Sequence, residues 1–148
     1  MSGSRRARTA AVALAALSAV ACDKVYHARI DAGPAPGATP SAQALSPEER
    51  ERAVSIFSSV ASRLGLSCGP GKYPIISGSY DEMQYQLTEC DKDHTQVQLA
   101  VASGHVSVEV HKISGFAEPP VFRECRMQFA EAFGKAFSSP RVTVRYPY

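Results

Sequence analysis

Three segments in the second half of the chain alternate between large apolar residues and small or polar ones, and this pattern constrains the fold most. The apolar positions are Met83, Tyr85 and Leu87, then Val97, Leu99 and Val101, then Val106, Val108 and Val110. Successive side chains of a β-strand point to opposite faces of a sheet, so each segment predicts a strand with one apolar face. Short spacings between the segments favour an antiparallel meander.

A two-residue turn at Ser103-Gly104 sets the expected register of the second hairpin. It pairs three apolar positions: Val101 with Val106, Leu99 with Val108, and Val97 with Val110. In the first hairpin we expect Leu87 to lie opposite Val97, which requires a loop with an odd number of residues, such as 91–93. This register gathers polar side chains on the other face: Gln84, Gln86, Gln96, Gln98, Glu109 and His111.

Two amphipathic segments flank the meander and predict helices. The first begins where Ser46 and Glu49 can form a capping box, with Pro47 at the first helical position. Its apolar positions are Ala53, Ile56, Phe57, Val60, Ala61 and Leu64. The second helix is expected at about 120–137, and its apolar positions are Phe122, Cys125, Phe129, Ala132, Phe133 and Ala136.

The remaining segments complete the predicted domain. Residues 68–71 contain two glycines and a proline and predict a loop, while Tyr73–Ser79 predicts a short edge strand. Alternation at 142–146 predicts a last strand after Pro140. We therefore expect one α+β domain over 46–148, with an antiparallel sheet of three to five strands, made of the meander and the C-terminal strand, and two helices packed on one face.

The N-terminal residues have the pattern of an export signal over 1–21. Three arginines between positions 5 and 8 precede an apolar run from Ala10 to Ala21, which is shorter than the roughly 20 residues that span a bilayer. The sequence Ala19-Val20-Ala21-Cys22 resembles the lipobox of bacterial lipoproteins. This resemblance implies lipidation at Cys22 and anchorage to a membrane of the bacterial cell envelope, facing the periplasm or the exterior. The same alanines also form an ordinary A-x-A cleavage site, so a soluble secreted protein is the alternative.

Residues 22–45 are expected to form a lipid-anchored tether. The segment is rich in proline, glycine and alanine and offers little that could form a buried face. A flexible chain of this length has an end-to-end distance of roughly 25 Å, which would hold the domain clear of the lipid headgroups.

The charge of the mature protein excludes nucleic acid as a partner. The chain has 16 Lys and Arg against 14 Asp and Glu, and cleavage after residue 21 removes three arginines and no acid. Thirteen basic residues then stand against 14 acidic ones, a net charge of about −1 with histidine neutral. A protein that displaces counterions from nucleic acid needs a basic patch, and the sequence shows none.

The cysteines predict one disulfide. If Cys22 carries a lipid, Cys68, Cys90 and Cys125 remain in an oxidising compartment and give one disulfide and one spare thiol. If it carries none, the four cysteines could form two bridges. The second helix should begin near the sheet end that also holds Cys90, so we expect a bridge between Cys90 and Cys125. A bridge between Cys68 and Cys90 is the alternative.

Known catalytic patterns are absent from the sequence: it has no nucleophile elbow, Walker, Rossmann, zincin or paired C-x-x-C motif. The sequence therefore predicts no enzyme and no cofactor. His94, His111, Asp91 and Asp93 could together hold zinc or copper. A hairpin loop already accounts for three of them, so we favour a solvated strand face over a metal site.

These features predict a non-enzymatic binding or assembly module that is tethered to the membrane by its N-terminal lipid and has a protein partner in the cell envelope. Two alternatives remain. One is an exported metal-binding or hydrolytic protein that uses the four residues above, and the other is a secreted inhibitor of a cell-envelope enzyme.

Overall fold

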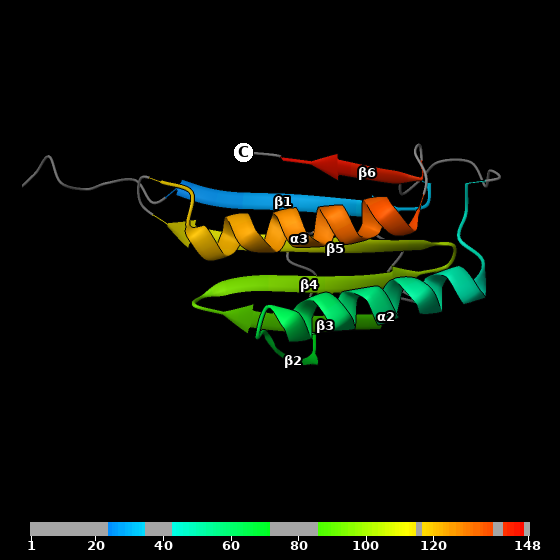
Figure 1. The fold of residues 1–148 in the computed structure, drawn as a ribbon, viewed down its shortest axis with the longest axis horizontal. Coiled ribbons are helices and arrows are strands. Elements are labelled where there is room, and N and C mark those ends of the chain that lie inside the picture. The colour runs from blue at the N-terminus through cyan, green and yellow to red at the C-terminus, as the bar shows by residue number, and fades with distance from the viewer. Residues whose placement is uncertain (1–23, 35–42, 72–85, 115–116, 138–140, 147–148) are drawn as a thin grey trace, which may run out of the picture.

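The computed structural model describes residues 24–34, 43–71, 86–114, 117–137 and 141–146, which form a six-stranded antiparallel sheet with two helices packed on it (Figure 1). The strands are β1 (Lys24–Ala32), β2 (Ser67–Pro70), β3 (Gln86–Lys92), β4 (Thr95–Ala102), β5 (His105–Ser114) and β6 (Val142–Arg145). Their order across the sheet is β2-β3-β4-β5-β1-β6. Helices α2 (Pro47–Arg63) and α3 (Pro120–Ala136) cover one face. The predicted α+β class and the placement of both helices are confirmed.

The core lies between the helices and the sheet. The predicted capping box begins α2, where the Ser46 hydroxyl accepts from the Glu49 backbone N–H at 3.2 Å and the Ser46 N–H donates to the Glu49 carboxylate at 3.0 Å. Phe57 of α2 stacks on Phe129 of α3 with ring centroids 5.1 Å apart. The buried residues of the two helices agree with the predicted apolar positions: Ala53, Phe57, Val60 and Ala61 on α2, and Phe122, Cys125, Phe129 and Phe133 on α3.

The strand register was predicted correctly for one hairpin and wrongly for the other. β4 and β5 pair as expected, with Leu99 opposite Val108. The β3–β4 hairpin instead turns on two residues, Asp93 and His94, with φ of 49° and 58°. Two consecutive residues with positive φ form a tight turn that matches the twist of the flanking strands, so an odd-numbered loop is not needed. Cys90 therefore lies opposite Val97, on the core face.

The shifted register moves Leu87 to the opposite face from the one predicted, and it lies beside Ala100 rather than Val97. Gln86, predicted to share the polar face, lies opposite Val101 instead. The other positions of these predictions lie outside the described residues: Tyr73–Ser79, Met83, Gln84 and Tyr85.

Part of the predicted tether is a strand in the interior of the sheet. β1 pairs with β5 on one side and with β6 on the other. Its residues Ala28, Ile30 and Ala32 are fully buried under the helices. Alanine is small enough for a helix to pack closely on the strand, which explains why these positions are buried. The same alanines are also typical of a flexible linker, which is why the sequence predicted a tether. β2 occupies most of the segment that was predicted as a loop at 68–71. With β1 and β2 the sheet has six strands, above the expected three to five.

Outside the described residues lie the predicted signal peptide at 1–21, Cys22 and residues 35–42 of the predicted tether. Among the residues that are described, no helix combines the length and the apolar character needed to cross a membrane.

Candidate functional site

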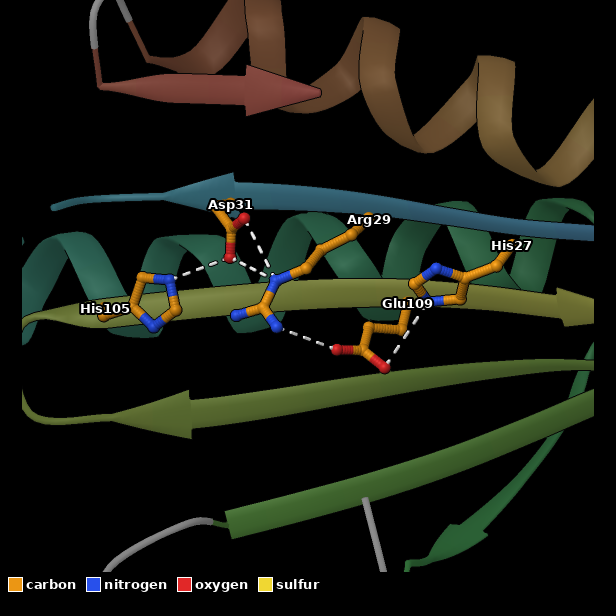
Figure 2. A network of polar contacts seen from close by, with 5 residues as sticks. All are labelled: His27, Arg29, Asp31, His105 and Glu109. Atoms are coloured by element: carbon orange, nitrogen blue, oxygen red, sulfur yellow. Dashed lines mark hydrogen bonds and ion pairs between the residues drawn. The ribbon is translucent and has the colours of Figure 1, made fainter. Parts of the chain in front are cut away.

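The sheet face turned away from the helices carries a cluster of buried ionisable side chains. Strand β1 contributes His27, Arg29 and Asp31, and strand β5 contributes His105 and Glu109 (Figure 2). We call these five residues the polar network. Its histidines and carboxylates are between 2% and 6% exposed. These side chains alternate with the core residues of the same strands, so one strand pair supplies both an apolar face and a buried charged face.

Arg29 lies at the centre of the polar network, between two carboxylates (Figure 2). Its Nε donates to Asp31 Oδ1 at 2.9 Å, and its Nη1 donates to Glu109 Oε1 at 3.1 Å. The register explains the second contact, because Arg29 and Glu109 are directly opposite across β1 and β5. A guanidinium can serve two carboxylates at once because its donors diverge in one plane.

A histidine flanks each carboxylate. His105 Nε2 is 3.0 Å from Asp31 Oδ1, which is a hydrogen bond. His27 Nε2 is 3.7 Å from Glu109 Oε2, close enough for an ion pair and too far for a hydrogen bond. The formal charges of Arg29 and the two carboxylates sum to −1.

Burial raises the pKa of Asp31, but this effect is outweighed by the hydrogen bond with His105 and by the charge and hydrogen bonds of Arg29. The pKa of Asp31 consequently lies below its ordinary value. The ionised form is therefore the one that the fold stabilises. A partly buried arginine with its charge compensated in this way is suited to hold two strands in register rather than to contact a partner.

Sequence reasoning missed the polar network because His27, Arg29 and Asp31 fall in the predicted tether. A signal was present, since polar residues at 27, 29 and 31 alternate with Tyr26, Ala28, Ile30 and Ala32. This is the two-residue period of a strand. The sequence did place Glu109 on the correct face. It did not indicate that this face is buried.

The four predicted metal-site residues do not form a cluster. Asp93 and His94 occupy the exposed β3–β4 turn, where the Lys112 ammonium contacts the Asp93 carbonyl oxygen. His111 lies opposite His27 on β1 and Gln96 on β4. Within the ranges that the structure describes, no group of three or more His, Cys, Asp or Glu side chains could hold a metal ion. Asp91 lies opposite Ser67 on β2.

His111 is itself in an unfavourable place for a positive charge. Its partial burial and the neighbouring His27 lower its pKa, and the nearby carboxylate of Glu109 only partly opposes this shift. The neutral imidazole is therefore favoured at this position.

The disulfide joins Cys68 and Cys90, so the favoured prediction of Cys90 with Cys125 is wrong and the alternative pair is the one found. The antiparallel register places Cys68 of β2 opposite Cys90 of β3, with Cα atoms 4.0 Å apart. Cys125 is a buried, unpaired thiol in α3. Burial, together with the charge of Glu124, raises the pKa of Cys125 to about 11, so the unreactive thiol form predominates at neutral pH.

A shallow, open groove of about 360 Å³ lies between the first half of α2 and the β3–β4 strand pair. Its lining residues are Pro47, Arg50, Glu51, Val54, Gln86 and Val101. Val54 and Val101 supply an apolar floor, and the opposite charges of Arg50 and Glu51 stand on the α2 side. We call this feature the α2 groove. Unlike the polar network, it can be reached from solvent.

Comparison of the chain with protein-family models and with curated proteins finds no match.

Proposed function

We propose that the chain is an exported lipoprotein, anchored through a lipid on Cys22, whose folded domain binds a protein of the cell envelope without catalysing a reaction. The disulfide between Cys68 and Cys90 supports an extracytoplasmic location, because such bridges persist in oxidising compartments. The lipobox-like sequence that ends at Cys22 supports the anchor.

The α2 groove is the observation that carries the binding proposal. It is widely open to solvent, whereas small-molecule sites bury most of their ligand. Its apolar floor and its opposite charges fit a polypeptide segment that presents an apolar side chain between a basic and an acidic residue. An acid of the partner would face Arg50, and a base would face Glu51.

Membrane fractionation and intact mass test the anchor. We expect the wild-type protein in the membrane fraction, with a mass that corresponds to a lipidated chain beginning at residue 22. The Cys22→Ser variant should be soluble. Recovery of that variant in the membrane fraction would refute anchorage by the lipid.

Site-specific photocrosslinking in cells tests the α2 groove. A photoreactive residue in place of Glu51 is expected to give one defined adduct with an envelope protein, and the same residue in place of Glu124 on α3 serves as the matched control. The adduct from position 51 should disappear when Arg50→Glu reverses the charge beside it. Equal adducts from both positions, or an adduct that is insensitive to Arg50→Glu, would contradict binding in the groove.

A further inference from the structure

We propose that the end of the sheet where β1 begins rests against the membrane surface and contacts the headgroups of anionic phospholipids. This inference depends on the proposed lipidation of Cys22 and adds an orientation to it. The polypeptide that would separate the lipid from the domain is far shorter than the tether that the sequence predicts, because β1 begins at Lys24.

The distance between the lipid and the sheet is limited by covalent geometry. Only two residue steps separate Cys22 from Lys24, and an extended chain covers at most about 3.5 Å per residue, or roughly 7 Å in all. The headgroup region on each side of a bilayer is itself about 5–7 Å thick. The first residue of β1 therefore lies within or directly beside the headgroups.

Several other elements meet at this end of the sheet. β5 ends there at Ser114, which lies opposite Lys24, and the β3–β4 turn and the first residues of α3 are at the same end (Figure 1). The β4–β5 turn at Ser103 is at the opposite end. An anchor at Cys22 would thus orient the sheet end-on to the membrane, so that the ends of its strands, and not one of its faces, lie against the lipid.

The side chains of β1 and β5 at this end fit an anionic lipid surface. Val25 and Ile113 are directly opposite each other on β1 and β5 and are 49% and 56% exposed. On the same face, His27 next to Val25 is buried and His111 next to Ile113 is half-buried. Lys24 is exposed, and its ammonium lies over the Tyr26 ring. Apolar side chains that enter the interface and lysines that reach the phosphates are the two contributions that hold a peripheral surface on a membrane.

A tryptophan reporter tests the orientation, because the chain has no tryptophan of its own. Lipidated Ile113→Trp protein, purified from membranes in detergent, would be reconstituted into phosphatidylcholine and phosphatidylglycerol vesicles that contain a headgroup-nitroxide lipid. Ser103→Trp is the matched control, because the eight strand steps from Ile113 to His105 cover about 26 Å and Ser103 lies in the turn beyond them. Val25→Trp provides a second reporter if the Ile113 variant fails to fold.

We expect strong quenching of the reporter at position 113 or 25 and little quenching at position 103. Replacing one lysine near an anionic surface should lower the ratio of domains that contact the headgroups to domains that do not by about fivefold. Lys24→Gln should therefore reduce quenching in anionic vesicles, whereas Lys135→Gln near the end of α3 should not.

Equal quenching at both ends, or none at either end, would overturn the proposed orientation while leaving the anchor intact. An intact mass without lipid would instead remove the anchor itself, so the two failures are distinguishable.

Discussion

Loss of the Cys68–Cys90 disulfide should reduce the stability of the domain by an amount that can be worked out from the structure. The bridge closes a loop with a sequence separation of 22. For such a loop, the chain-entropy relation gives an unfolded-state entropy loss of about 11 cal/mol/K, equivalent to about 3 kcal/mol at about 25 °C. With a urea m-value of about 2 kcal/mol/M, the unfolding midpoint should fall by about 1.5 M on reduction.

The assay is urea unfolding of the soluble Cys22→Ser protein, followed by far-ultraviolet circular dichroism with and without a reducing agent. Cys125→Ala serves as the control because Cys125 forms no bridge. This variant should keep the full difference between oxidised and reduced protein, whereas Cys68→Ala should abolish it. If Cys125→Ala abolished the difference and Cys68→Ala preserved it, the pairing and the derived loop length would both be wrong.

Three further predictions concern the polar network and the core. Arg29→Met leaves the carboxylates of Asp31 and Glu109 buried without their shared cation, and urea unfolding should show a loss of about 3–5 kcal/mol. The pKa of Asp31 is lowered in the fold, so its contribution to stability is present above pH 3.8 and is lost as pH falls through the folded-state pKa. Stability measured against pH should therefore decline less steeply in acid for Asp31→Asn than for the wild type. Phe129→Ala removes a fully buried ring and should cost about 3–5 kcal/mol by thermal or urea unfolding, whereas a loss below about 1 kcal/mol would contradict the packing between the helices.

The sequence patterns that predicted the fold correctly were those in which large side chains mark the buried face. Valine and leucine at every second position of β4 and β5 allow only one register around a two-residue turn, and the structure has that register. The phenylalanines of α3 mark its buried face in the same way. Large apolar residues are costly to expose, so their spacing carries reliable information about the core.

The features that sequence reasoning missed depend on small or polar residues. Ala28 and Ala32 cost little to expose, so hydrophobicity gives them no preference for a buried strand over a linker. The turn at Asp93 and His94 requires positive φ at two residues without glycine, and its length decides which face of β3 carries Cys90. The disulfide depends on a second pairing, the register of β2 with β3, which brings Cys68 opposite Cys90.

The polar network shows a different limit of sequence reasoning. Alternation correctly placed Glu109 on the face without helices, but it cannot distinguish a solvated face from a buried one. A charged side chain is buried on that face only where a compensating charge meets it. The sequence separation of 80 between Arg29 and Glu109 hides this pairing from any local pattern.

The place of β1 in the sheet has a consequence for the order in which the domain can assemble. This first strand lies between β5 and β6, so the strands on both of its sides come from much later in the chain. In a chain that crosses a membrane N-terminus first, β1 could not pair with its neighbours until β5 (105–114) and then β6 (142–145) had also crossed. Contacts between such distant segments form slowly, because a long loop must close before they are made. The sheet would therefore form only after most of the chain had crossed, and the chain would stay unfolded during translocation.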